Sequence, residues 1–102
     1  MTRILIALLV FLTPLVCHAE WRTVEVTAYC DQGYTASGEW VQEGFAASDD
    51  LPIGTTVIVN GQRYVVMDRF GGGYTDHLDL YMSSYDDAVN FGRQYLDVYV
   101  ER

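Results

Sequence analysis

The sequence contains no lysine, so its six arginines stand alone against 14 aspartates and glutamates, and the formal net charge is −8. All 14 acids and five of the arginines lie after residue 19. A surface of this charge repels phosphate groups, so we expect neither nucleic acid nor anionic lipid as a partner. Neutral, zwitterionic and cationic ligands remain compatible with it.

Cysteine and histidine are also scarce, with two of each. After residue 19 only Cys30 and His77 remain, so this part of the chain cannot form an internal disulfide. A Ser-His-Asp or Cys-His hydrolase fits poorly. Of the three states open to Cys30, namely buried and inert, free, or bonded to another chain, we favour the first. His77 has acids at 76 and 79, but adjacent strand residues point to opposite faces, so we expect no metal and no other cofactor.

The one long apolar run lies at the N-terminus. Arg3 precedes an apolar stretch over residues 4–16, and Cys17-His18-Ala19 supplies small residues for a signal-peptidase site. This run is short for a membrane span. We predict a signal peptide over residues 1–19 and one small domain over residues 20–102, exported to the periplasm or cell envelope, or secreted, and not membrane-spanning. A lipid anchor on Cys17 and an uncleaved anchor are the alternatives.

The remaining sequence is rich in short β-type segments. Alternating or β-branched runs predict strands over residues 23–29, 45–47, 55–59, 63–67, 78–81 and 96–100. Asn60-Gly61 between two of these runs predicts a tight hairpin, because both residues tolerate positive φ. Residues 30–44 contain three glycines and predict a loop.

One short helix is predicted near the C-terminus. Ser84 is a good N-cap, acids at 86 and 87 favour the first turn, and Gly92 can end the helix with positive φ. We expect Ala88, Val89 and Phe91 to face the core. Six short strands and one helix predict an all-β fold that closes into a small barrel, since closure removes exposed sheet edges.

A series of short motifs runs in order through the predicted domain. They are Thr27-Ala28-Tyr29, Thr35-Ala36-Ser37-Gly38, Ala46-Ala47-Ser48-Asp49, Leu51-Pro52-Ile53-Gly54-Thr55, Asp68 with a glycine-rich segment, Leu78-Asp79-Leu80-Tyr81, and Ala88 with Phe91-Gly92-Arg93. In this order they resemble the 3D domain, named for three aspartates, of the membrane-bound lytic transglycosylase A family and of small muralytic proteins of the stationary-phase-survival type. The resemblance implies a six-stranded double-psi β-barrel that binds peptidoglycan glycan strands. In active members it implies non-hydrolytic cleavage between N-acetylmuramic acid and N-acetylglucosamine.

The resemblance also assigns the three aspartates. The segment from His77 to Tyr81 matches the one that carries the family's catalytic aspartate, so Asp79 takes the acid/base role. Asp68 matches the aspartate that opens the family's glycine-rich loop. The remaining aspartate is Asp49 or Asp50, of which we select Asp49. The loop departs from the family pattern, because its glycines are shifted and the family's lysine is missing.

The chemistry of a glycosidic bond fits these acids. A carboxyl group can give the leaving oxygen its proton. On a strand, Asp79 would face away from Leu78 and Leu80, toward a cleft, and a path back through residues 71–75 would place Asp68 beside it. Repulsion between two close carboxylates would raise one pKa. We expect the substrate-binding residues to be Thr27, Tyr29, Trp40, Tyr74 and His77.

Other interpretations of the same residues stay open. Aspartates at strand ends often only satisfy backbone N–H groups, and aromatic residues often only pack. The altered glycine-rich loop favours a noncatalytic module of the cell envelope that binds glycan or protein. A third possibility is an exported partner or inhibitor protein whose acidic face meets a basic enzyme.

Overall fold

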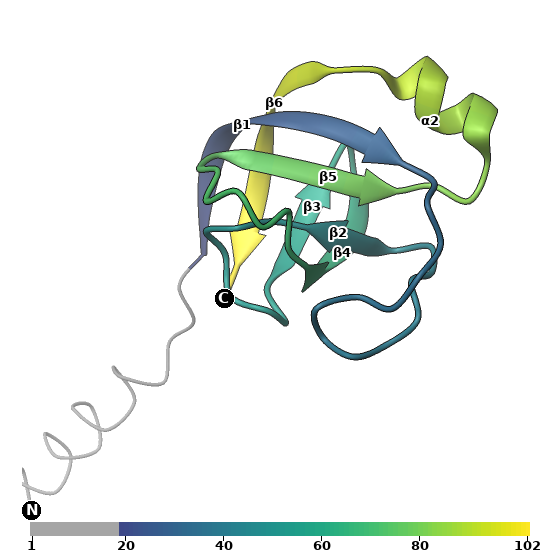
Figure 1. Cartoon of the computed structure of the whole chain (residues 1–102). Coiled ribbons are helices and arrows are strands. Elements are labelled where there is room, and N and C mark those ends of the chain that lie inside the picture. The colour runs from purple at the N-terminus through teal and green to yellow at the C-terminus, as the bar shows by residue number, and fades with distance from the viewer. Residues whose placement is uncertain (1–18) are drawn as a thin grey trace, which may run out of the picture.

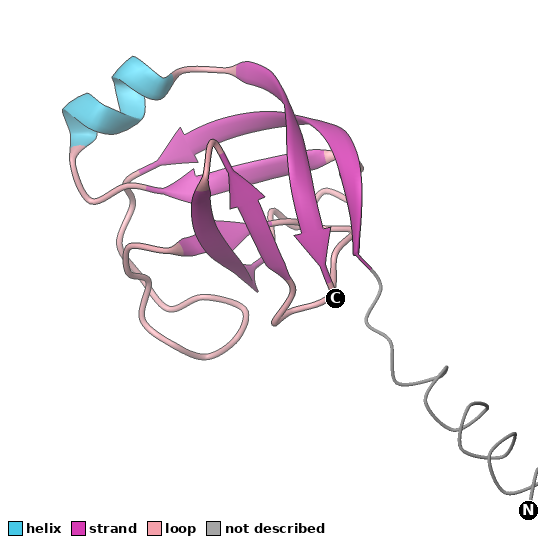
Figure 2. Ribbon diagram, turned by 180° about the vertical axis from the view of Figure 1, so that it is seen from behind, coloured by secondary structure: helices cyan, strands magenta, loops and turns pink. Residues whose placement is uncertain are grey.

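The structure, a computed structural model, describes residues 19–102, so the predicted signal peptide lies almost entirely outside the described residues. The elements follow in the order β1 (Ala19–Tyr29), β2 (Phe45–Ala47), β3 (Thr56–Val59), β4 (Gln62–Asp68), β5 (His77–Tyr81), α2 (Tyr85–Phe91) and β6 (Gln94–Glu101). The strands close into a barrel in the order β1-β5-β2-β4-β3-β6 (Figure 1; Figure 2). The predicted all-β barrel of six strands with one short helix is confirmed.

Two of the strand pairs are parallel, namely β1 with β5 and β2 with β4, while the other pairs are antiparallel. Parallel neighbours need long connections, and the loop over residues 30–44, predicted from its glycines, is the first part of the connection from β1 to its parallel neighbour β5. Parallel pairing also brings the carboxyl ends of β1 and β5 to the same edge, where Tyr29 pairs with Tyr81.

The hairpin between β3 and β4 is confirmed at the predicted residues. Val59 pairs with Gln62 across the turn, and Asn60 and Gly61 take φ angles of 51° and 78°. Two consecutive positive φ angles give the tight turn whose twist matches that of the flanking strands.

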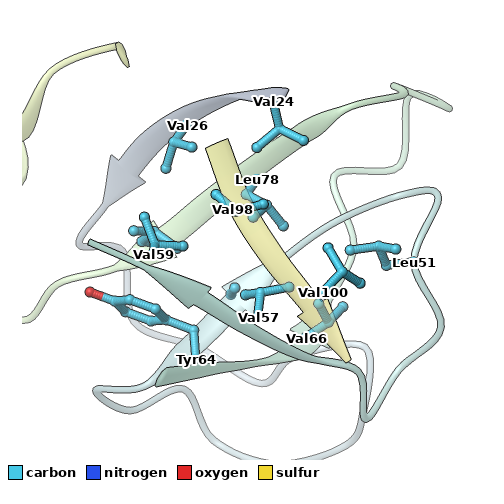
Figure 3. Packing of buried hydrophobic residues seen from close by; sticks show 12 residues of the cluster. Val24, Val26, Leu51, Val57, Val59, Tyr64, Val66, Leu78, Val98 and Val100 are labelled. Carbon is cyan, nitrogen blue, oxygen red and sulfur yellow. The ribbon is translucent and has the colours of Figure 1, made fainter. Parts of the chain in front are cut away.

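The barrel interior is filled by β-branched side chains (Figure 3). Val26, Val57, Val66, Val98 and Val100 are completely buried, and each comes from the inward face of its strand. A second, smaller cluster of Val41, Phe45 and Tyr81 packs with Tyr29 and Met67. Branched side chains suit this interior, because they are stiff and pack well on a pleated surface.

The helix begins and ends as predicted, with Ser84 accepting the Asp87 N–H and Gly92 at a φ of 64°. Ala88 is buried and Phe91 packs on the core, but Val89 is exposed, so its expected core position is wrong. Residues 88 and 91 share one face of a helix, and residue 89 is turned about 100° away from residue 88. Among residues 19–102, no helix has the length and apolar character needed to cross a membrane.

Cys30 comes directly after β1, where the chain enters the loop over residues 30–44. It is partly exposed and forms no disulfide within the described part of the chain. The expectation that Cys30 is buried is therefore wrong, because Cys30 lies in the loop after β1 and not on the inward face of a strand.

The core description predicts the effect of one truncation. Leu78 lies at the centre of the barrel with 1% of its surface exposed. We expect Leu78→Ala to lower the free energy of unfolding by about 2–5 kcal/mol, from lost burial and the remaining cavity. We expect Val89→Ala, on the exposed face of α2, to change it by no more than about 0.5 kcal/mol. Urea unfolding with a common m-value measures both, and equal effects would show that Leu78 is not a core residue.

Candidate functional site

Strand β2 holds Asp68 and Asp79 on either side of one small residue. Ala47 is the pairing partner of Asp68 on β4 and of Asp79 on β5. Since neighbouring strands lie about 4.8 Å apart, the two aspartates start from positions roughly 10 Å apart with only a methyl group between them. All three residues line one cleft of about 300 Å³. The predicted convergence of Asp68 and Asp79 is confirmed.

The loop that follows β1 forms another wall of the cleft. The remaining lining residues are Tyr29, Asp31, Gln32, Gly33, Tyr34, Val41, Arg69 and Phe70. Sequence reasoning missed Asp31, the third acid of the cleft. No local signal marks Asp31, because its position beside Asp79 follows from the parallel pairing of β1 with β5.

Asp79 faces away from the core, as predicted, because Leu78 and Leu80 on either side of it are buried. Thr27, its pairing partner on β1, donates a hydrogen bond from Oγ1 to Asp79 Oδ1 at 2.9 Å. His77 Nε2 lies 3.0 Å from the same Oγ1. When the one proton of the threonine hydroxyl is donated to Asp79, the same oxygen can accept a hydrogen bond from the His77 ring. His77, Thr27 and Asp79 thus form one hydrogen-bonded chain.

Burial raises the pKa of Asp79. The hydrogen bond from Thr27 and the charge of His77 lower this pKa, and the charge of Asp31 raises it further. The direction matches the prediction, but the main cause is loss of solvent, and the repelling carboxylate is that of Asp31. Asp79 therefore keeps its proton to a higher pH than an ordinary aspartate.

Asp68 also has a structural function at the end of β4. Its Oδ1 accepts hydrogen bonds from the N–H of Ala36 at 2.9 Å and from the N–H of the next residue, Arg69, at 2.8 Å. The first of these bonds holds the turn at residues 35–38, where Gly38 takes positive φ, against the barrel. Within residues 19–102, Oδ2 of Asp68 makes no hydrogen bond, so it is open to a ligand.

Asp49 does not line the cleft, and its carboxylate instead binds the backbone of the glycine-rich segment. Its Oδ1 accepts the N–H groups of Phe70 and Gly71, and its Oδ2 accepts those of Gly72 and Tyr74, at 2.8 to 3.2 Å. These hydrogen bonds lower the pKa of Asp49, and the bond from the Gly71 N–H has the largest effect. The expectation that Asp49 joins Asp68 and Asp79 in one site is corrected here, because Asp49 does not line the cleft and its carboxylate accepts four backbone N–H groups that organise the loop.

The glycine-rich segment over residues 69–76 is fixed at both ends as well. Arg69 donates to the Ser48 carbonyl at 2.7 Å and to the Leu51 carbonyl. Asp50 accepts the Asp76 N–H at 3.1 Å, and Arg22 bridges both of these acids. Glycine is required at positions 71 and 73, whose φ angles are 93° and 72°.

The predicted aromatic ligands Trp40 and Tyr74 stand just outside the cleft. Trp40 packs edge-on against Tyr34, with ring centroids 5.0 Å apart, and Tyr74 packs in the same way against Phe70 at 5.7 Å. Phe70 also lies 4.6 Å from the His77 ring. Trp40 and Tyr74 therefore support the lining residues Tyr34 and Phe70, while both stay more than half exposed.

Tyr29 does reach the cleft, as predicted. Its ring packs edge-on against Tyr81, with centroids 5.4 Å apart, and its hydroxyl is buried without a hydrogen-bond partner in the described part of the chain. Burial, followed by the charges of Asp68 and Asp79, raises the pKa of Tyr29. The phenol of Tyr29 therefore stays protonated. In residues 19–102, no group of three His, Cys, Asp or Glu side chains is placed to hold a metal ion.

The comparisons with known proteins bear on the fold. The sequence matches no model of a known protein family and no curated protein. Among solved structures, the Streptomyces papain inhibitor has a similar fold, with a TM-score of 0.58 and 19% sequence identity. The similarity covers 81% of this chain and 96% of the inhibitor. At this identity it shows a shared barrel architecture and nothing about the site.

The raised pKa of Asp79 predicts a pH-dependent stability difference. The folded state holds this proton more tightly than the unfolded chain, so the contribution of Asp79 is full below the unfolded pKa and is lost as the pH rises through the folded pKa. Asparagine does not titrate, so the Asp79→Asn variant does not lose this stability as the pH rises. We expect the variant to be more stable than the wild type at neutral pH, with the advantage vanishing below about pH 4.

Urea unfolding at several pH values measures this difference, and Asp97→Asn is the matched control. Asp97 also accepts a hydrogen bond from a β1 threonine, Thr23, but it lies on the exposed side of β6. It thus reports the effect of removing one surface charge. An Asp79→Asn curve that parallels the control at every pH would contradict the proposed burial of the Asp79 charge.

The four hydrogen bonds to Asp49 predict how the glycine-rich loop responds when one carboxylate oxygen is replaced by the nitrogen of asparagine. In Asp49→Asn the side-chain nitrogen cannot accept, so two of the four backbone N–H groups lose their acceptor. We expect faster amide exchange at Gly72 and Tyr74, or at Phe70 and Gly71 if the amide turns over, with the barrel strands unchanged. NMR amide exchange measures this effect. Unchanged exchange at all four sites would show that Asp49 does not organise the loop.

Proposed function

We propose that this protein is an exported, peptidoglycan-active enzyme of the lytic transglycosylase type, with Asp79 as its general acid and base. The proposal stands mainly on one observation. A half-buried carboxyl group with a raised pKa is held by Thr27 in a cleft that a second free carboxylate, that of Asp68, also lines. The acidic surface suits an uncharged glycan strand and a location in the periplasm or envelope.

Asp79 can serve both halves of such a reaction. In the first half it gives its proton to the glycosidic oxygen that leaves, and the raised pKa keeps that proton available. The resulting carboxylate is stabilised by the hydrogen bond from Thr27. In the second half it takes a proton from the sugar's own 6-hydroxyl as that oxygen attacks, which closes a 1,6-anhydro ring. One carboxyl group suffices, and no cofactor or nucleophilic water is needed.

Asp68 has an electrostatic function in this scheme. The transition state of glycoside cleavage carries positive charge on the sugar ring. Asp68 is held across Ala47 from Asp79 by two backbone N–H groups, so its charge faces the same cleft from a fixed position. A preorganised carboxylate stabilises developing positive charge without rearrangement.

The second candidate is an envelope module that binds a glycan or a protein without turnover. Its support is the fold shared with a papain inhibitor and the exposed Tyr34 and Trp40 in the loop over residues 30–44, which are 78% and 51% exposed. Exposed aromatic residues of this kind are common in binding surfaces.

Digestion of purified sacculi separates the two candidates. We expect the wild type to release products with 1,6-anhydro ends, detected by mass spectrometry, and Asp79→Asn to lower the rate about 10²- to 10⁴-fold, the usual contribution of a general acid. Asp97→Asn should retain the wild-type rate. If Asp79→Asn cleaves at the wild-type rate, Asp79 is not the acid. Binding of sacculi without products would favour the module, and inhibition of papain without binding to sacculi would favour an inhibitor.

A further inference from the structure

Residues 33–41, within the loop that follows β1, form a small closed hairpin. Tyr34 and Trp40 pair across it as an antiparallel bridge. Inside the turn, Thr35 donates to the Glu39 carbonyl from both its N–H and its Oγ1, each at 2.9 Å. These bonds pair backbone groups that an open loop would leave to water, so the hairpin has a defined shape.

The hairpin is also fastened to the barrel. Its last residue, Val41, is buried. In the turn, the Ser37 N–H donates to the Met67 carbonyl at 3.0 Å, and the Ala36 N–H donates to the carboxylate of Asp68. Met67 and Asp68 are the last two residues of β4. The same strand end therefore positions the hairpin and carries one acid of the cleft.

Tyr34 is a residue of this hairpin that lines the cleft and is nevertheless open to solvent. It is 78% exposed, although it shares the cleft lining with Asp79. Trp40 packs against it with ring centroids 5.0 Å apart and ring planes at 89°, so Trp40 covers only one side of the tyrosine ring. An aromatic side chain this exposed adds little to folding, because little of its area is removed from water. Tyr34 thus offers accessible apolar surface on a fixed support at the cleft.

An accessible ring of this kind matches the apolar face of a sugar. A pyranose ring presents a face of C–H groups, and such a face packs against the face of an aromatic ring, whose electron density attracts the C–H hydrogens. The contact needs no charge, so the acids of the cleft do not oppose it. A ring that the hairpin already holds loses little conformational freedom when a ligand binds. The matching ligand is therefore a strand of pyranose rings.

We propose that Tyr34 is a substrate-binding residue, on which one sugar ring of the glycan stacks while a glycosidic bond further along the strand lies at Asp79. This inference rests on the proposed function, since it takes the glycan assigned to the cleft as the ligand. It adds a binding position on the hairpin, away from the acids. Affinity for the glycan and cleavage of the glycan then depend on different side chains, Tyr34 and Asp79.

Tyr34→Ala tests this contact, because it removes the ring. The probe is the neutral tetramer of β-1,4-linked N-acetylglucosamine, which lacks the N-acetylmuramic acid of the bond that is cleaved, and NMR titration measures its Kd. We expect Tyr34→Ala to raise this Kd about 5- to 30-fold, the range for truncation of an aromatic residue that matters for binding. Tyr34→Phe keeps the ring and should bind within about 2-fold of the wild type.

Tyr95→Ala is the matched control. Tyr95 is 72% exposed on β6 and does not line the cleft. We expect this variant to bind the tetramer with unchanged affinity. Amide exchange at Thr35 and Val41, whose N–H groups close the hairpin, reports whether the hairpin stays formed in Tyr34→Ala. If exchange at both amides becomes faster as the affinity falls, Tyr34 acts by holding the hairpin, and its assignment as the sugar contact is wrong.

The remaining outcomes separate this inference from the proposed function. If Tyr34→Ala binds the tetramer like the wild type, or if the wild type does not bind it, no sugar stacks on Tyr34, while release of 1,6-anhydro products from sacculi would still support the enzyme. If the wild type binds the tetramer through Tyr34 but releases no products from sacculi, the enzyme proposal fails and Tyr34 remains a sugar contact of a binding module.

Discussion

The short strand β2 is the constraint on which the barrel and its cleft both depend. It is three residues long, yet it pairs with both β4 and β5 and so lies between them in the closed sheet. A register shift between Ala46 and Ala47 moves the pairing on β4 past Met67, so that Ala47 meets Asp68. Because side chains alternate along a strand, an unshifted register would set Met67 beside Ala47 and turn Asp68 to the other face. The bulge therefore puts the second acid into the cleft, and the methyl group of Ala47 leaves the space between the acids open.

The glycine-rich segment depends on the same region, since Asp49 and Asp50 follow β2 after a single residue, Ser48. Asp49 accepts four N–H groups of the segment and Asp50 accepts one more at its end. Three consecutive glycines would otherwise leave the backbone free to move. Once the segment is held, Phe70 rests against His77, and His77 is hydrogen-bonded through Thr27 to Asp79. The order of the loop and the position of the acid are thus parts of one contact network.

What the sequence could predict was local. Period-two alternation, Asn60-Gly61 and the Ser84 cap identify strands, hairpin and helix, because each depends on a few adjacent residues. The outward direction of Asp79 follows from the leucines on either side of it. The parallel pairs, the extra residue of β4 opposite β2 and the approach of Asp31 to Asp79 depend on contacts between distant segments, which no single segment encodes. The place of Asp49 outside the cleft could not be predicted for a related reason: a motif fixes the position of a carboxylate in the chain, whereas its hydrogen bonds depend on which backbone lies next to it.

The aspartates around β2 differ in how many of their oxygens accept hydrogen bonds from the protein. Both oxygens of Asp49 and Asp50 accept hydrogen bonds within the protein, and the positive charge of Arg22 also serves Asp50. In the cleft, Asp68 and Asp79 each use one oxygen, and the phenol of Tyr29 between them uses none. Arg69 is the cation nearest to these groups in the cleft lining, and its guanidinium donates to two backbone carbonyls. The fold thus uses both oxygens of the two acids that hold the glycine-rich segment, whereas Asp68 and Asp79 each keep an oxygen without a hydrogen bond inside the protein, at the cleft that both line.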